Sequence, residues 1–177
     1  SEVEELLKRL RESSRRVREL SKRSNEEVHR SSDKVRRDSE ESNRELHKIV
    51  EDLKRENRDD AVRRVKKRLD DVVEKDRKIV EDDVKLARDV VERDRRIAEE
   101  DVRELERVVK EVERDLEDER KLREARKEVK KLIEESREVL ERSERNIREL
   151  IKESRRLLEE SRRNVERLKK ELEDTRK

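Results

Sequence analysis

The chain has 177 residues, of which 61% are charged and 27% are apolar, with no Gly, Pro, Cys, Met or aromatic residue. This composition excludes disulfides and thiolate sites, and the α-helix is the only regular structure that its residue types favour. The 55 basic and 53 acidic residues alternate along the chain, without the clustered cations or stacking aromatic rings of a polyanion-binding surface, so we expect no nucleic-acid partner.

Membrane-spanning and secretory segments are also not expected. No apolar run approaches the roughly 20 residues that cross a membrane, and no charged segment followed by an apolar one indicates a secretory signal. We therefore expect a soluble protein without membrane contact, and the sequence carries no signal for a particular compartment.

The first predicted helix covers residues 2–56 and contains a loose eighteen-residue repeat. Its start is indicated by Ser1 and Glu4, which have the spacing of a capping box. Asn57 suits the left-handed conformation that follows many helices, and this places the first turn at residues 57–60. The repeated positions are Ser24 and Ser42, Asn25 and Asn43, and His29 and His47.

The second predicted helix covers residues 60–116, with Asp59 or Asp60 as its capping residue. Its repeat is clearer, because residues 74–91 are matched by residues 92–109. The repeat aligns two pairs of aspartates, Asp76 with Asp94 and Asp83 with Asp101.

The third predicted helix covers residues 119–175, with Asp118 as its capping residue. Residues 132–149 match residues 150–167 position by position. Eighteen residues at 3.6 per turn make five whole turns, so each side chain returns to the same face of a nearly straight helix. The repeat aligns two pairs of serines, Ser136 with Ser154 and Ser143 with Ser161.

The numbering of the polar residues indicates how the helices face one another. In an antiparallel pair, facing residues are equally far from the turn, so their numbers add to a constant. The pairs between the second and third helices are Asp101 with Ser136, Asp94 with Ser143, Asp83 with Ser154, and Asp76 with Ser161. The pairs between the first and second helices are Ser24 with Asp94, Ser42 with Asp76, His29 with Asp89, and His47 with Asp71. The residue numbers add to 237 in each pair between the second and third helices, and to 118 in each pair between the first and second. Half of each sum, 118.5 and 59, falls between two predicted helices.

These observations predict an all-α fold in one domain over residues 1–177. The architecture is an up-down-up antiparallel three-helix bundle of long, nearly straight helices, each about 57 residues and roughly 85 Å long. Adjacent apolar residues, such as Val72 and Val73 or Ile79 and Val80, recur every three or four positions and form a stripe that can pack against two neighbours.

Serine and aspartate are expected on the inward faces, where they would form polar layers between apolar ones. Serine hydroxyls donate hydrogen bonds and an aspartate accepts several, so such layers fix the register of the helices. One layer would join Ser24, Asp94 and Ser143. The next equivalent layer would join Ser42, Asp76 and Ser161. In the alternative interpretation, these residues border the apolar stripe and stay hydrated.

No metal, cofactor, small-molecule or catalytic site is expected. The two histidines lie eighteen residues apart on one helix, about 27 Å at the helical rise, and cannot share an ion within a chain. Each histidine would instead bond an aspartate across the interface or occupy a boundary position. The serines have no Ser/His/Asp order that indicates a nucleophile, so we predict that the protein is not an enzyme.

The straight repeating helices, the Ser/Asn/Asp/His core candidates and the Glu/Arg/Lys surface resemble computationally designed parametric helical bundles with buried hydrogen-bond networks. The resemblance covers the whole chain and implies a designed structural scaffold without natural biochemical activity. It carries over no functional residues. The chain departs from that style in having neither Gly nor Pro for its turns.

Two other functions remain open at this point. One is a helical interaction module, which would self-associate or accept a further, designed helix in a leftover apolar groove. The other is a single charged α-helix that acts as a spacer, about 265 Å long if continuous. The paired apolar stripes favour the bundle over the spacer.

Overall fold

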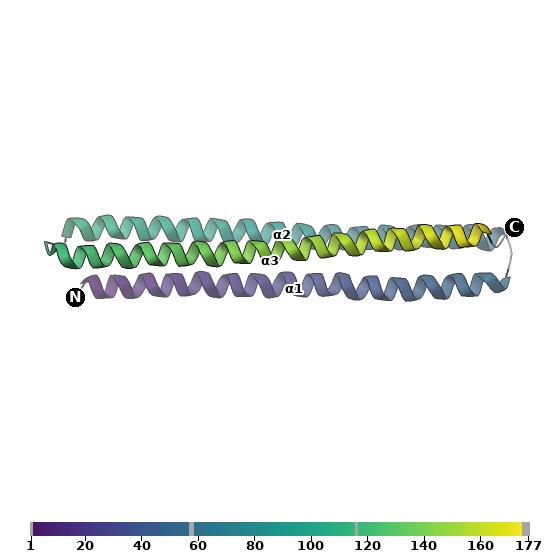
Figure 1. The fold of residues 1–177 in the computed structure, drawn as a ribbon, viewed down its shortest axis with the longest axis horizontal. Coiled ribbons are helices and arrows are strands. Elements are labelled where there is room, and N and C mark those ends of the chain that lie inside the picture. Colours follow the sequence, from purple (N-terminus) through teal and green to yellow (C-terminus); the bar gives the residue numbers. More distant parts are fainter. Residues whose placement is uncertain (1, 57–58, 116, 175–177) are drawn as a thin grey trace. The chain divides into compact units, whose positions relative to one another are not determined.

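The computed structural model describes residues 2–56, 59–115 and 117–174, which form three α-helices (Figure 1). The helices are α1 (Glu2–Glu56), α2 (Asp59–Asp115) and α3 (Glu119–Asp174). Their bounds differ from the predicted ones by at most one residue. The predicted helix ends at residues 116 and 175, and the predicted capping roles of Ser1 and Asn57, lie outside the described residues.

The start of α3 shows how a helix is capped in a chain without Gly or Pro. The Asp118 carboxylate accepts a hydrogen bond from the backbone N–H of Arg120 at 3.0 Å. The Asp118 carbonyl accepts the first helical hydrogen bond, from the N–H of Leu122 at 3.1 Å. This is the arrangement of an N-cap residue, and it confirms the predicted role of Asp118.

The chain divides into two compact units, and each contains a part of all three helices. Unit 1 consists of Ser1–Glu27 and Arg88–Arg148, and unit 2 consists of Val28–Ala87 and Glu149–Lys177. Each unit has apolar and polar layers of its own. The single domain over residues 1–177 stays a prediction.

Hydrogen bonds within the units give the helix directions. In unit 2, the sequence separation falls from 51 for Ser32–Asp83 to 34 for Ser42–Asp76, as expected for antiparallel α1 and α2. It rises from 71 for Asp83–Ser154 to 85 for Asp76–Ser161, so α2 and α3 are also antiparallel.

In unit 1, two α1–α3 ion pairs have the same separation of 117 residues, as expected for parallel helices. These pairs are Arg11 with Glu128 and Arg18 with Glu135. The fold is therefore the predicted all-α, up-down-up three-helix bundle. The single-helix spacer is wrong, because side chains of all three helices contact one another.

The apolar stripes of the three helices form the core of each unit, because residues three or four positions apart share one helix face. In unit 1 the core cluster consists of Leu10, Leu105, Val108, Val112, Ala125, Val129 and Leu132. In unit 2 the larger cluster consists of Leu46, Ile49, Val50, Leu53, Ala61, Val62, Val65, Leu69, Val165, Leu168 and Leu172. A smaller cluster of unit 2 contains Val35, Val80 and Val84.

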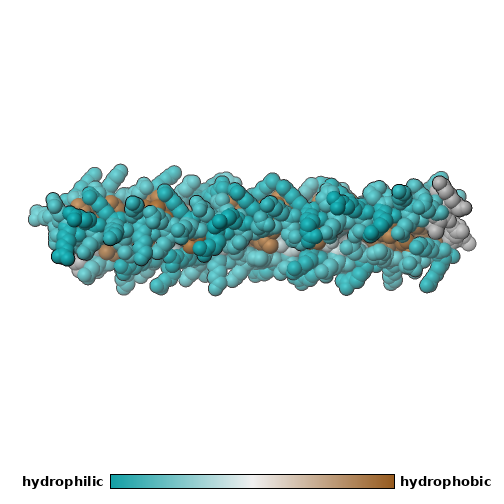
Figure 2. Space-filling model, viewed as in Figure 1, coloured by the Kyte–Doolittle hydropathy of each residue, from teal (hydrophilic) through white to brown (hydrophobic). Residues whose placement is uncertain are grey.

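Charged side chains cover these cores. None of the large apolar side chains that the structure describes is exposed. Figure 2 shows a face made mostly of hydrophilic residues, with apolar atoms visible only in the gaps between them. A chain with 61% charged residues still buries an apolar stripe on each helix, because the long charged side chains lie on the opposite faces.

The core of unit 2 should be sensitive to a change at Leu69, which is 0% exposed. We expect Leu69→Ala to lower the free energy of unfolding by about 2–5 kcal/mol, because it removes buried methyl groups and leaves a cavity. The exposed variant Arg63→Ala should change it by less than about 0.5 kcal/mol. Denaturant unfolding of both variants tests this, and similar effects would contradict the assigned core.

Candidate functional site

The most distinctive side chains of this fold are serines and aspartates buried in the apolar core. The buried aspartates all belong to α2 and are Asp76, Asp83, Asp94 and Asp101. The buried serines of α3 are Ser136, Ser143, Ser154 and Ser161. The buried serines of α1 are Ser14, Ser21, Ser24, Ser39 and Ser42. A buried carboxyl group is costly without hydrogen bonds, so the partners of these aspartates decide what the layers do.

The Asp76 layer of unit 2 joins all three helices. The Ser42 hydroxyl of α1 donates to Asp76 Oδ1 at 3.1 Å. The Ser161 hydroxyl of α3 donates to Asp76 Oδ2 at 2.6 Å. Both carboxylate oxygens thus have a donor. The three residues are those predicted from the sequence to form one layer.

The Asp83 layer of unit 2 has the same form. The Ser154 hydroxyl donates to Asp83 Oδ2 at 2.6 Å. From α1, the Ser32 hydroxyl lies 3.5 Å from both oxygens of Asp83. Ser32 was not among the predicted layer residues, although it lies eighteen residues after the buried Ser14.

The Asp94 layer of unit 1 is only partly joined. Ser24 donates to Asp94 Oδ1 at 3.0 Å, and its hydroxyl oxygen accepts a hydrogen bond from Arg93 at 3.0 Å. Ser143, which was expected to bond Asp94, instead accepts a hydrogen bond from Asn25 Nδ2 at 2.8 Å. Among the described residues, the buried Asp94 Oδ2 has no partner.

The Asp101 layer of unit 1 differs further from the expectation. Ser13 of α1 donates to Asp101 Oδ1, and this serine was not predicted. The expected partner, Ser136, forms no hydrogen bond through its hydroxyl within the described part of the chain, and neither does Asp101 Oδ2. The predicted bond between Asp101 and Ser136 is therefore not formed, and Asp101 is bonded to α1 through its other oxygen.

Asparagines add contacts between α1 and α3. In unit 2, Asn164 Nδ2 donates to Asn43 Oδ1 at 3.3 Å. In unit 1, Asn25 Nδ2 also donates to the Ser21 carbonyl at 2.8 Å. The eighteen-residue repeat had marked these asparagines, but the pairing rule for antiparallel helices does not apply to the parallel α1 and α3.

The two histidines do not belong to the buried layers. His29 and His47 are exposed, as are Asp89 and Asp71, and no hydrogen bond joins the two predicted pairs in the described residues. The reason is the helical rotation of about 100° per residue. Val28 and Leu46 occupy the buried positions, so the residue after each of them faces solvent.

Burial changes the acidity of three layer aspartates. It raises the pKa of Asp76 to about 6, and the nearby Asp38 carboxylate acts in the same direction, against hydrogen bonds from Ser161 and Ser42. Burial also raises the pKa of Asp94, and it raises the pKa of Asp101. Each raised value means that the neutral carboxyl group is favoured more strongly in the folded state than in the unfolded one.

Ion pairs at the edges of the helix interfaces also join the helices outside the layers. In unit 1, Arg95 of α2 binds both carboxylate oxygens of Glu144 of α3, with Nη2 to Oε2 at 2.9 Å. The hydrogen bond from Arg95 lowers the pKa of Glu144. Such pairs contribute modestly, about 0.2–1 kcal/mol each when exposed, so they do not replace the apolar core.

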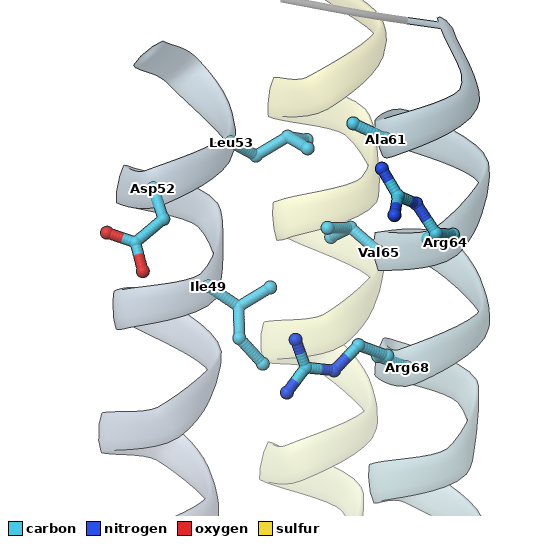
Figure 3. A pocket seen from close by; sticks show the side chains of 7 residues that line it. All are labelled: Ile49, Asp52, Leu53, Ala61, Arg64, Val65 and Arg68. Atoms are coloured by element: carbon cyan, nitrogen blue, oxygen red, sulfur yellow. The ribbon is translucent and has the colours of Figure 1, made fainter. Parts of the chain in front are cut away.

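A hollow in unit 2 lies between α1 and α2 and has a volume of about 280 Å³ (Figure 3). Leu53 and Val65 point into this space, while the guanidinium groups of Arg64 and Arg68 lie at its edge. Its lining residues are Ile49, Asp52, Leu53, Ala61, Arg64, Val65 and Arg68. These seven residues include no Ser, Thr, Cys, Lys or His, and Asp52 is the one carboxylate among them.

The acidic and histidine side chains of the helices do not gather into a metal centre. Within residues 2–56, 59–115 and 117–174, no group of three or more His, Cys, Asp or Glu side chains is placed to hold a metal ion. In the same residues, no helix combines the length and the apolar character needed to cross a membrane.

Comparisons with known proteins show a similarity of fold. No family model matches the chain, and no curated protein matches it. The chain is similar to a solved structure described as a "Computationally designed three helix bundle", with a TM-score of 0.69 and 18% sequence identity. The match covers 98% of this chain and 90% of the other. At this identity, the similarity shows the fold.

The raised pKa of Asp76 should appear in the pH dependence of stability. Its ionised form opposes folding, so stability is greatest below its ordinary pKa of 3.8 and is lost as the pH rises through about 6. We expect the free energy of unfolding to increase on the order of 2 kcal/mol from this group between pH 7 and pH 4.

Denaturant titrations at several pH values measure this effect, with Asp76→Asn as the comparison. The variant should lose the part of the change that belongs to Asp76, mainly between pH 7 and pH 5. This range lies above that in which exposed glutamates with lowered pKa values, such as Glu153, lose their contribution. An unchanged slope in Asp76→Asn would contradict the assignment.

The bond between Ser161 and Asp76 should show energetic coupling. A double-mutant cycle with Ser161→Ala and Asp76→Ala should give a coupling energy of about 1–3 kcal/mol, because a buried carboxyl oxygen loses its donor. A cycle with Ser161→Ala and Asp83→Ala is the matched control, since Asp83 is about 10 Å from Asp76 along α2. Equal coupling in the two cycles would refute a specific bond.

Proposed function

We propose that this protein is a designed structural scaffold without natural biochemical activity, whose buried polar layers set the register of its helices. The observation that carries the proposal is the Ser42–Asp76–Ser161 layer, in which one carboxylate of α2 accepts hydrogen bonds from both neighbouring helices. The same arrangement recurs at Asp83.

Sequence features support an artificial origin. A chain of 177 residues without Gly, Pro, Cys, Met or aromatic residues is far from ordinary usage, in which Gly and Pro together make up about 12% of residues. Whole-turn repeats in all three helices are typical of construction from idealised geometry. The similar solved structure is itself described as a computationally designed bundle, which agrees with this interpretation.

Polar layers are suited to a scaffold because apolar packing alone discriminates poorly between registers. A valine or leucine that moves by one helical turn meets another apolar residue of similar size. Asp76 would instead lose both serine donors, at about 1–3 kcal/mol for each unsatisfied buried group. The layers thus disfavour alternative alignments more than they stabilise the correct one.

In a scaffold of this kind, the layer serines have no catalytic role. Ser42, Ser154 and Ser161 donate their hydroxyl protons to aspartates within the core. The candidate bases, His29 and His47, lie on the exposed surface. A nucleophile needs a base within hydrogen-bond distance and access to a substrate, so a non-enzymatic scaffold fits the arrangement better.

The helical interaction module is supported by a groove between α2 and α3 in unit 1. This groove has a volume of about 440 Å³, and the partly buried Val109 and Ile133 are among its lining residues. However, Arg126 and Glu113, which also line it, form an ion pair with 2.8 Å between Nη2 and Oε1. A further helix would have to displace this pair, so we favour the scaffold.

The role in register is tested by an apolar variant of one layer, Ser42→Ala with Asp76→Leu and Ser161→Ala. We expect equal or higher resistance to denaturant, because apolar replacements of buried polar groups often stabilise a fold. We also expect loss of a unique structure, seen as several sets of amide cross-peaks in NMR spectra.

The control for this experiment is the variant with Leu46→Ile, Leu69→Ile and Leu168→Ile, which changes three buried residues of unit 2 without altering polarity. It should keep one set of cross-peaks. A single set in the apolar layer variant would contradict the proposed role in register.

Self-association separates the scaffold from the interaction module. Size-exclusion chromatography with light scattering should give the monomer mass of 21.8 kDa for the scaffold. A stable multiple of this mass would favour the module, and Ile133→Glu should then restore the monomer by placing a charge in the α2–α3 groove.

A further inference from the structure

The Asp101 layer of unit 1 contains several buried polar atoms without a partner among the described residues. They are Asp101 Oδ2, Ser14 Oγ and Ser136 Oγ. The three residues are well enclosed, with exposed fractions of 8%, 4% and 2%. A buried carboxylate oxygen that lacks a donor is costly, so the arrangement calls for a hydrogen-bonding group between these atoms.

The hydrogen bonds of unit 2 indicate that these three residues lie at one level. The eighteen-residue repeat relates them to Ser32, Asp83 and Ser154, whose side chains are joined directly. Ser14 lies eighteen residues before Ser32, and Asp101 lies eighteen residues after Asp83. Ser136 lies eighteen residues before Ser154, so the same antiparallel register places all three residues at one level along the helices.

The two serine–aspartate hydrogen bonds of the unit 2 layer have no direct equivalents in unit 1, where another serine bonds the aspartate. Ser13 donates to Asp101 Oδ1, so α1 presents the neighbouring serine to the carboxylate. Ser14 and Ser136 are left without a hydrogen bond to the second oxygen, Asp101 Oδ2. The layer therefore combines one strong acceptor with two hydroxyl groups, each of which can donate and accept.

We infer that the Ser14–Asp101–Ser136 layer of unit 1 is a binding site for one ordered water molecule. The water donates one hydrogen bond to Asp101 Oδ2 and a second to a serine oxygen, and it accepts one from the other hydroxyl. Three partners are the usual number for a buried water in a protein. The equivalent layer of unit 2 has no need of such a water, because its serines bond Asp83 themselves.

A crystal structure of the full chain at high resolution is the direct test. We expect a water peak within about 3 Å of Asp101 Oδ2 and of at least one of the two serine hydroxyls. We expect none in the Ser32–Asp83–Ser154 layer. A direct bond from Ser14 or Ser136 to Asp101 Oδ2, without water, would overturn the inference, as would a metal cation in place of the water.

Solution measurements give a second test with a matched control. Oxygen-17 magnetic relaxation dispersion counts long-lived internal water molecules, and Asp101→Leu should lower this count by one relative to the unaltered protein. Asp83→Leu, in the equivalent layer, should leave the count unchanged. Both leucines suit an apolar core, so the variants should fold. Equal counts in all three proteins would refute the water site.

Discussion

The structure depends on the requirement that a buried carboxylate be met by hydrogen-bond donors. All the buried aspartates of the described residues lie on α2, so their donors must come from α1 and α3. Asp76 shows the complete form, with one serine from each neighbour. A single residue thereby fixes the positions of two helices relative to a third. Apolar packing supplies most of the favourable free energy, but it does not supply this selectivity.

The two units use the same residue types with different results. Asp83 in unit 2 has donors on two helices, whereas its repeat equivalent Asp101 in unit 1 has a donor only from α1. The buried side-chain atoms without partners, among the residues that the structure describes, all belong to unit 1. A sequence repeat thus reproduces the position of a side chain more faithfully than its hydrogen bonds, because the first of two adjacent serines bonds the aspartate in unit 1 and the second does so in unit 2.

The sequence predicted the helices, the cap at Asp118 and the up-down-up order, because these follow from periodicity and from the chemistry of a single residue. It also paired Asp76 with both of its serines. It missed Ser13 and Ser32, because each belongs to a pair of adjacent serines, and the facing member depends on helix rotation. It placed His29 in an interface, although the residue beside Val28 faces solvent. The numbering gives the position of a residue along the helix axis, but not the direction in which its side chain points around that axis.

The short turn before α3 has a role that the polar layers cannot perform. Sliding α2 by eighteen residues would again place an aspartate opposite a serine, so the layers alone are degenerate under a shift of one whole repeat. Such a shift moves a helix by about 27 Å, which a turn closed by the Asp118 cap cannot span. The turn before α3 therefore excludes a shift of α2 by a whole eighteen-residue repeat. Within one repeat, the buried aspartates and their serine donors determine which residues of the helices face one another.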